Sequence, residues 1–114
     1  TIKQLKEMKR DTTNKFKAWV LSDILSQGNK QDIQDYLNNS IHGCSSGTIT
    51  SLIYYEDTEK VFKRYFVDIF EYLGELKENG LIENFELDYN SLVWMAYDYI
   101  ISDIINELGG LSND

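Results

Sequence analysis

The stretch that decides the fold of this chain is residues 88–108, which have the sequence DYNSLVWMAYDYIISDIINEL. Apolar side chains recur there at the three- and four-residue spacing of a helix, and they cover most of its circumference. The polar remainder is a narrow strip formed by Asp98, Ser102 and Asn106. A helix that is apolar on nearly all sides is normally enclosed by other helices. We therefore predict that this C-terminal helix is central in a helical bundle.

The chain before residue 88 supplies the helices that would surround it. Apolar residues at helical spacing, with polar capping residues and glycines between the runs, set the expected boundaries. Whether the first two helices are separate or form one bent helix stays open, because Asp11–Asn14 could break or only kink the chain. The predicted helices are a short one through Ile2 and Met8, a second to about Gln27, a third from Asn29 to about Ile41, a short buried one around Ile49–Tyr54, and a long one from Asp57 or Thr58 to Glu78.

Composition supports one compact all-α domain spanning residues 1–114, a bundle of about five helices. The chain has 114 residues, of which 42% are hydrophobic, and this is enough to bury a core. It contains no proline and a single cysteine, so helices are not interrupted and no internal disulfide can form. No apolar run approaches the length of a membrane span. We expect a cytoplasmic protein.

Charge is distributed unevenly along the chain, whose net charge is −8. Six basic and two acidic side chains give residues 1–17 a charge of +4, whereas eleven acidic and one basic give residues 65–114 a charge of −10. The acidic half would repel phosphates, which argues against direct nucleic-acid binding. It would attract a basic protein surface.

The acidic run after residue 67 is the candidate partner-binding site. Its first four members are spaced three, four and three residues apart, so they line one face of the predicted long helix. The carboxylates would lie ~5–6 Å apart, comparable to the spacing of phosphates along a nucleic-acid strand. A solvated face that only aids solubility is the alternative interpretation. The predicted partner-binding residues are Asp68, Glu71, Glu75, Glu78, Glu83, Glu86 and Asp88.

A second unusual stretch runs from His42 to Thr58 and holds the single histidine, the single cysteine and two of the seven glycines. We interpret it as a tight, buried corner around which the other helices are organised, with Cys44 facing Ala96 or Ile100 of the last helix. Glycine tolerates the positive φ that such a turn requires. The residues of this predicted structural motif are His42, Gly43, Cys44, Ser46, Gly47, Tyr54, Tyr55, Asp57 and Thr58.

Catalytic and metal sites are poorly supported by the residues present. Cys44 and His42 could form a nucleophile and base, but no third group is visible to orient the histidine. A zinc site needs three or four ligands, which one cysteine and one histidine do not provide. The turn Gly43–Gly47 lacks both the length and the lysine of a phosphate-binding loop. We predict no catalytic residue, no metal and no cofactor.

The segments His42–Cys44, Ser46–Gly47, Ser51–Tyr55 and Asp57–Thr58, with Trp94, Ala96–Tyr97 and Ile105–Gly109, resemble a family of small uncharacterised proteins from bacteriophages and mobile elements. The resemblance covers roughly residues 33–110, and Thr48 departs from it where a larger apolar residue is expected. It implies no catalytic residue. It does imply a phage origin, and small acidic phage proteins such as anti-CRISPR and antirestriction proteins often act as inhibitors.

These observations lead to one principal expectation about function and two alternatives. We expect an acidic, non-enzymatic phage protein that binds the basic surface of a host nucleic-acid-binding defence complex in the bacterial cytoplasm, as a nucleic-acid mimic, with no direct nucleic-acid or membrane partner. The first alternative is a self-associating structural or regulatory protein, in which the basic N-terminus meets the acidic C-terminal half of another copy. The second is an enzyme that uses Cys44 and His42.

Overall fold

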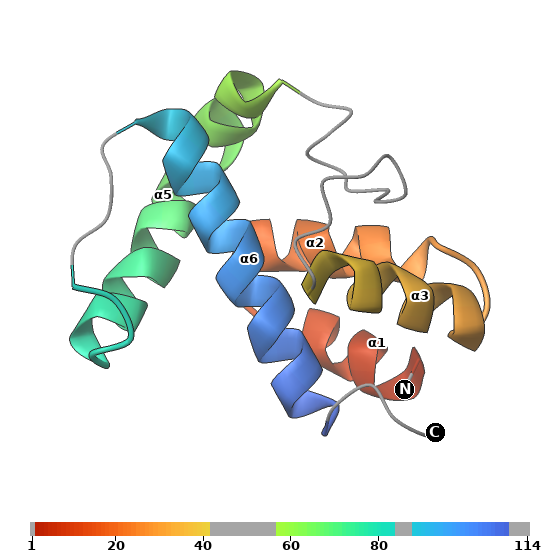
Figure 1. The fold of residues 1–114 in the computed structure, drawn as a ribbon. Coiled ribbons are helices and arrows are strands. Elements are labelled where there is room, and N and C mark those ends of the chain that lie inside the picture. Colours follow the sequence, from red (N-terminus) through yellow and green to blue (C-terminus); the bar gives the residue numbers. More distant parts are fainter. Residues whose placement is uncertain (1, 42–56, 84–87, 110–114) are drawn as a thin grey trace.

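The computed structural model describes residues 2–41, 57–83 and 88–109 of the 114-residue chain. Within these ranges every element of regular secondary structure is an α-helix (Figure 1), so the predicted all-α fold is confirmed. The helices of the described residues are α1 (Ile2–Asp11), α2 (Lys15–Leu25), α3 (Lys30–Ile41), α5 (Thr58–Glu78) and α6 (Tyr89–Glu107).

The last helix, α6, occupies the centre of the bundle, as its apolar circumference predicted. It packs against α2, α3 and α5, whereas α1 packs mainly on α2 (Figure 1). Its polar strip of Asp98, Ser102 and Asn106 is exposed. Its buried side chains are those of Leu92, Val93, Ala96, Tyr97, Ile100, Ile101, Ile104 and Ile105.

The N-terminal region forms two separate helices, which answers the question that the sequence left open. α1 ends at Asp11, and α2 begins at Lys15. The side-chain oxygen of Asn14 accepts a hydrogen bond from the backbone N–H of Lys17 at 3.0 Å and caps α2. Short polar side chains that bond to nearby backbone groups therefore separate the two helices, as the composition of residues 11–14 suggested.

The turn between α2 and α3 depends on Gly28, whose φ of +129° suits glycine and few other residues. The next residue, Asn29, accepts a hydrogen bond from the backbone N–H of Asp32 at 3.0 Å. The Asp32 carboxylate accepts one in return from the backbone N–H of Asn29 at 3.2 Å. This reciprocal pair caps α3 immediately after the glycine turn.

The inward face of α5 differs at Phe66 from the one that its spacing predicts. The predicted inner stripe, widened at its edge, is Phe62, Phe66, Ile69, Leu73 and Leu76 with Val61, Tyr65 and Tyr72. Ile69, Leu73 and Leu76 are buried as expected, but Phe66 is 49% exposed. Val61 and Tyr72, at the edge of the stripe, are buried as well. Apolar residues cover more than one side of this helix, so the pattern could not show which edge of the apolar surface turns toward α6.

A glycine inside a helix suggests a bend at Gly74, whereas the bend in α5 lies at Tyr65. Tyr65 has φ −124° and ψ 20°, outside the helical region. Its ring packs against Phe16 at 5.7 Å and Trp19 at 5.3 Å between ring centroids. These aromatic contacts with α2 offset the cost of the local departure from helical geometry.

Replacing Gly74 with alanine should raise the free energy of unfolding by about 0.5–1 kcal/mol. Gly74 is an internal residue of α5, and a Cβ built on it meets no heavy atom within 4 Å. Alanine would therefore restrict the unfolded chain without a clash in the folded one. Chemical denaturation measures the change. For comparison, Gly28→Ala should destabilise the protein, because its positive φ disfavours a side chain and a Cβ would collide with the Asp32 carboxylate.

The starts of α5 and α6 are capped and joined to each other. Asp57 accepts a hydrogen bond from the backbone N–H of Glu59 at 2.8 Å, and Asp88 accepts one from that of Ser91 at 3.3 Å. Thr58 Oγ1 donates to Asn90 Oδ1 at 3.0 Å across the two helices. Both aspartates thus act as N-caps of their helices. Among the described helices, none has the length and apolar character needed to cross a membrane.

Candidate interaction surface

Acidic side chains from three helices converge where α1 ends and α2 begins. Two adjoining surface hollows of about 320 Å³ each have Asp11, Thr12 and Lys17 in common. We call the combined feature the acidic hollow. Its acidic lining residues are Glu7 and Asp11 from α1, Glu71 and Glu75 from α5, and Asp103 and Glu107 from α6.

A joint between α2 and α5 holds the walls of the acidic hollow in place. Asn14, which is buried, donates a hydrogen bond from Nδ2 to the backbone oxygen of Asp68 at 2.9 Å. The backbone N–H of Lys15 donates to Asp68 Oδ1 at 3.0 Å. Asp68 therefore serves the fold by accepting hydrogen bonds at the start of α2. Because Asp68 is bonded to the start of α2, the next carboxylates along α5, those of Glu71 and Glu75, lie in the lining of the hollow.

Lys17 is the single basic side chain among the described residues that line the acidic hollow. Its Nζ lies 3.6 Å from Glu107 Oε1, and its side chain is mostly buried. Asp11 has a cationic neighbour as well, since Arg10 Nε lies 3.1 Å from its Oδ1. Two cations cannot balance six carboxylates, so the hollow keeps a negative potential that would attract a basic ligand.

The environment of Tyr72 reports the same negative field. Its hydroxyl donates a hydrogen bond to Asp103 Oδ2 at the floor of the hollow. Burial raises the pKa of Tyr72, and the hydrogen bond to Asp103 and the negative charges of Asp103, Glu75 and Glu107 raise the pKa further. Tyr72 therefore remains a neutral donor at physiological pH and helps to keep the Asp103 carboxylate in position.

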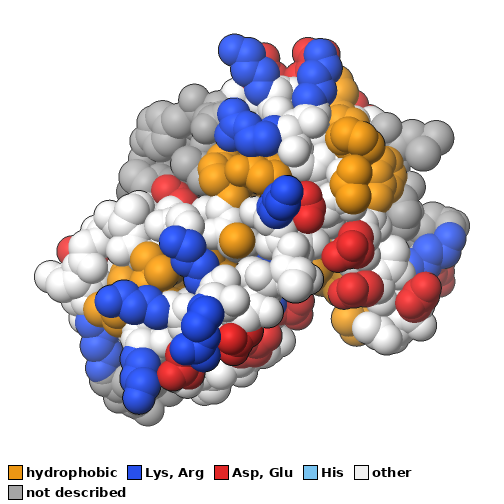
Figure 2. Space-filling model, turned by 180° about the vertical axis from the view of Figure 1, so that it is seen from behind, with side chains coloured by type: hydrophobic (Ala, Val, Ile, Leu, Met, Phe, Trp, Pro, Cys, Tyr) orange, Lys and Arg blue, Asp and Glu red, His pale blue; other side chains and the backbone are white. Residues whose placement is uncertain are grey.

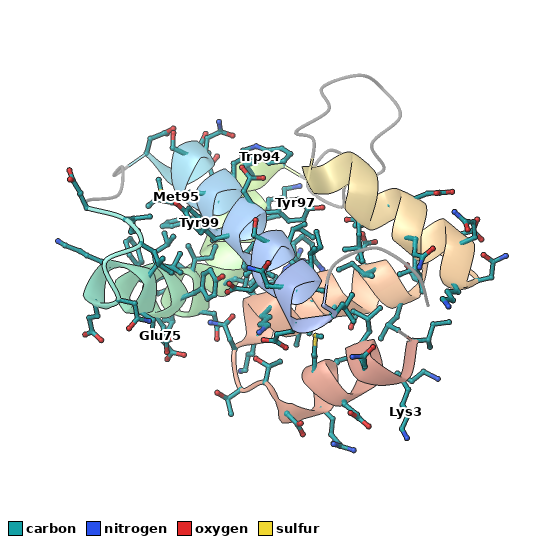
Figure 3. All side chains as sticks on the ribbon, turned by 60° about the horizontal axis from the view of Figure 1, so that its bottom comes forward. Lys3, Glu75, Trp94, Met95, Tyr97 and Tyr99 are labelled. Carbon is teal, nitrogen blue, oxygen red and sulfur yellow. The ribbon has the colours of Figure 1, made fainter. Side chains whose placement is uncertain are left out.

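The structure describes six of the seven residues predicted to bind a partner. Glu71 and Glu75 line the acidic hollow, and Figure 3 shows Glu75 extending outward from α5. Glu78 and Glu83 are exposed near the end of α5 and in the following connector. Asp68 and Asp88 act as hydrogen-bond acceptors at helix starts. Glu86 lies outside the described residues.

Sequence reasoning missed the four other acidic residues of the hollow, namely Glu7, Asp11, Asp103 and Glu107. Two of them belong to the N-terminal segment whose net charge is positive, and two belong to the central helix. No spacing in the chain links these positions to Glu71 and Glu75. Only the packing of α1, α5 and α6 around α2 brings them together.

The motif from His42 to Thr58 lies almost wholly outside the described residues. This applies to His42, Gly43, Cys44, Ser46, Gly47, Tyr54 and Tyr55, and to the predicted contact of Cys44 with the last helix. Its final two residues, Asp57 and Thr58, cap α5 and bond to α6 as described above. In the described part of the chain, no group of three or more His, Cys, Asp or Glu side chains is arranged to hold a metal ion.

A buried polar chain connects α2, α3 and α6 and was not predicted. The Tyr36 hydroxyl donates to Asp23 Oδ2 at 2.9 Å and lies 2.7 Å from the Tyr97 hydroxyl. Figure 3 shows Tyr97 on the side of α6 that faces α3. Burial is the main cause that raises the pKa of Tyr36, so this phenol stays protonated and is unsuited to act as a base. The chain therefore holds three helices together.

Titration of Asp23 should weaken the fold as the pH rises. Burial raises the pKa of Asp23 above its ordinary 3.8, and the hydrogen bond from Tyr36 only partly opposes this shift. Because the pKa of Asp23 is higher in the folded state than in the unfolded state, this carboxyl group stabilises the fold fully below pH 3.8, the ordinary pKa. That stabilisation is lost as the pH rises through the folded-state pKa. Wild type should therefore lose free energy of unfolding relative to Asp23→Asn between acidic and neutral pH, as measured by denaturation at each pH.

The control for the lost charge is Asp35→Asn, which changes an exposed carboxylate on α3. It should follow the pH profile of wild type. A profile for Asp23→Asn that runs parallel to wild type across the whole range would contradict the assigned direction of the shift.

Comparison with known proteins places the chain in a family without adding a reaction. Neither the curated proteins nor the solved structures gave a match. A family described as Domain of unknown function (DUF7222) matches residues 5–110, which includes all of α2, α3, α5 and α6. This agrees with the expectation of an uncharacterised family, and the match covers nearly the whole chain. The protein belongs to the Domain of unknown function (DUF7222) family.

Proposed function

We propose that this protein is a non-enzymatic inhibitor, encoded by a phage or mobile element, that binds the basic nucleic-acid-binding surface of a host defence complex. The observation that carries the proposal is the acidic hollow, where six carboxylates from three helices surround a single lysine. A protein surface built to bind phosphates is rich in lysine and arginine. The same cations would be attracted to the hollow.

Positioning of the carboxylates favours recognition over mere solubility. Glu71 and Glu75 occupy successive turns of α5, about 5–6 Å apart, and α5 is fixed to α2 through Asn14 and Asp68. Among the described residues neither glutamate forms an ion pair within the chain. Their charges are therefore held in position and stay available to arginine or lysine side chains of a partner.

Some basic groups of this chain lie away from the acidic hollow. Figure 3 shows Lys3 of α1 and Glu75 of α5 at opposite sides of the molecule. Elsewhere lysine and arginine side chains lie beside acidic ones, as Figure 2 shows. Attraction of a basic partner therefore depends on the local excess of carboxylates at the hollow.

The test measures binding to a host nuclease complex that has been purified through its association with the wild-type chain. It compares two double variants, in each of which two carboxylates are replaced by neutral amides. The Glu71→Gln, Glu75→Gln pair removes two carboxylates of the hollow, and the Asp35→Asn, Asp98→Asn pair removes two exposed carboxylates elsewhere. The hollow pair should raise the dissociation constant at least about tenfold and flatten its salt dependence. The control pair should bind like wild type.

Competition with duplex DNA gives a second measurement. If the hollow occupies the nucleic-acid site, saturating DNA should displace the wild-type chain from the complex, and the chain should block DNA binding in return. Affinity that is independent of salt, equal effects of the two variant pairs, or simultaneous binding of chain and DNA would each overturn the proposal.

A further inference from the structure

The outward side of α5 carries an apolar strip, which we define as Phe66, Val67 and Phe70. Their exposed fractions are 49%, 60% and 38%, the largest apolar exposure along this helix. The ring of Phe62 lies beneath the strip, at 6.3 Å from Phe66 and 5.9 Å from Phe70 between centroids. Figure 2 shows hydrophobic side chains together over α5, beside acidic ones. Large apolar side chains clustered at a surface mark an interaction site.

The charges on either side of this strip have opposite signs. Lys60, Lys63 and Arg64 precede it on α5, together with Glu59, which pairs with Lys63 at 3.3 Å, and all four are exposed. Glu71, Glu75 and Glu78 follow it, with Lys77 among them, and these four are exposed as well. The helix thus has a net positive charge before the strip and a net negative charge after it, over residues 58–78.

We propose that the apolar strip binds the same strip of a second copy of this chain, with the two α5 helices antiparallel about a two-fold axis. In that arrangement the basic end of each α5 lies on the acidic end of the other, and the apolar residues meet in the middle. A parallel pair would instead place like charges together. The surface is therefore self-complementary in one orientation, as an isologous interface requires.

This interface differs from a head-to-tail contact between the basic N-terminus and the acidic C-terminal half. A head-to-tail contact leaves one free end on each copy and continues into larger assemblies, whereas a two-fold contact stops at two copies. Glu71 and Glu75 also line the acidic hollow. A second copy seated on α5 would therefore exclude the basic partner proposed above.

Sedimentation equilibrium of the full chain over a wide concentration range tests the proposal. The mass should rise from that of the 13.3 kDa monomer to twice that value and no further. Val67→Glu places a charge in the strip and should raise the dimer dissociation constant at least about tenfold. Leu81→Glu, at an equally exposed apolar residue (58%) beyond the end of α5, should dimerise like wild type.

Charge reversal tests the antiparallel orientation. Lys60→Glu with Lys63→Glu makes both ends of α5 acidic, and Glu75→Lys with Glu78→Lys makes both ends basic, so each variant alone should lose self-association. In the chain that carries all four changes, the two ends of α5 again have charges of opposite sign, and the net charge equals that of wild type. This chain should therefore dimerise again. Circular dichroism confirms that each variant is folded.

The inference would be overturned if the wild-type chain stayed monomeric at every concentration or if its mass grew past that of two copies. Failure of the variant with all four charge reversals to dimerise would also overturn it. An unchanged dimer in Val67→Glu would do so as well. None of these outcomes bears on the DNA competition measured for the proposed function, so the two proposals fail independently.

Discussion

Replacing Phe16 with alanine should lower the free energy of unfolding by about 3–5 kcal/mol, the largest effect expected from one substitution here. Phe16 has no exposed surface, and its ring lies 5.8 Å from Trp19 and 5.7 Å from Tyr65 between centroids. Alanine would leave a cavity at the contact between α2 and α5. It would also remove a ring that packs against Tyr65, where α5 departs from helical geometry.

Phe66→Ala is the matched control, because it makes the same chemical change at a side chain that is 49% exposed. It should alter the free energy of unfolding by about 1 kcal/mol or less. Denaturant titration monitored by the two tryptophans measures both variants. Similar losses for the two phenylalanines would show that the burial assigned to α2 and α5 is wrong.

Asn14→Ala should lower the free energy of unfolding by about 2–3 kcal/mol, which is large for a polar residue. Two functions of one side chain disappear together. Its oxygen caps α2 through the backbone N–H of Lys17, and its Nδ2 donates to the backbone oxygen of Asp68 on α5. Asn14 is only 8% exposed, so water could not replace these bonds without a local opening of the structure.

Asn14→Ser separates the two contributions. Serine can still cap α2, but it cannot reach Asp68 with a donor, so the loss should be smaller than for alanine by about 1 kcal/mol. Equal losses for serine and alanine would mean that the cap contributes nothing. A loss near zero for serine would mean that the bond to α5 is unimportant for the joint that supports the acidic hollow.

The acidic hollow has a consequence for stability as well as for binding. Six carboxylates line the hollow, and the described ion pairs that involve them are those of Lys17 with Glu107 and of Arg10 with Asp11, so an excess of negative charge remains. Added salt should therefore stabilise this protein while it weakens any complex with a basic partner. These charges lower the stability of the free protein and would raise that of a complex with a basic partner. Such a surface is consistent with a role in binding.

Several local features followed from the sequence because they depend on neighbouring residues. The break before α2 needs only short polar side chains such as Asn14, the turn after α2 needs Gly28, and the start of α5 needs the carboxylate of Asp57. The central position of α6 followed from a helix with almost no polar side. In each case the deciding interaction lies within one helix or its ends.

Other features depended on which surfaces meet, and these the sequence did not specify. Phe66 is 49% exposed although the apolar pattern placed it on the inner stripe of α5, whereas Val61 and Tyr72 at the edge of that stripe are buried. Asp68, one of the residues predicted to bind a partner, accepts hydrogen bonds from the start of α2. The acidic hollow joins α1, α5 and α6 across the fold. Periodicity gives the direction of a side chain around its own helix, and only the packing of the helices decides which side chains from different helices become neighbours.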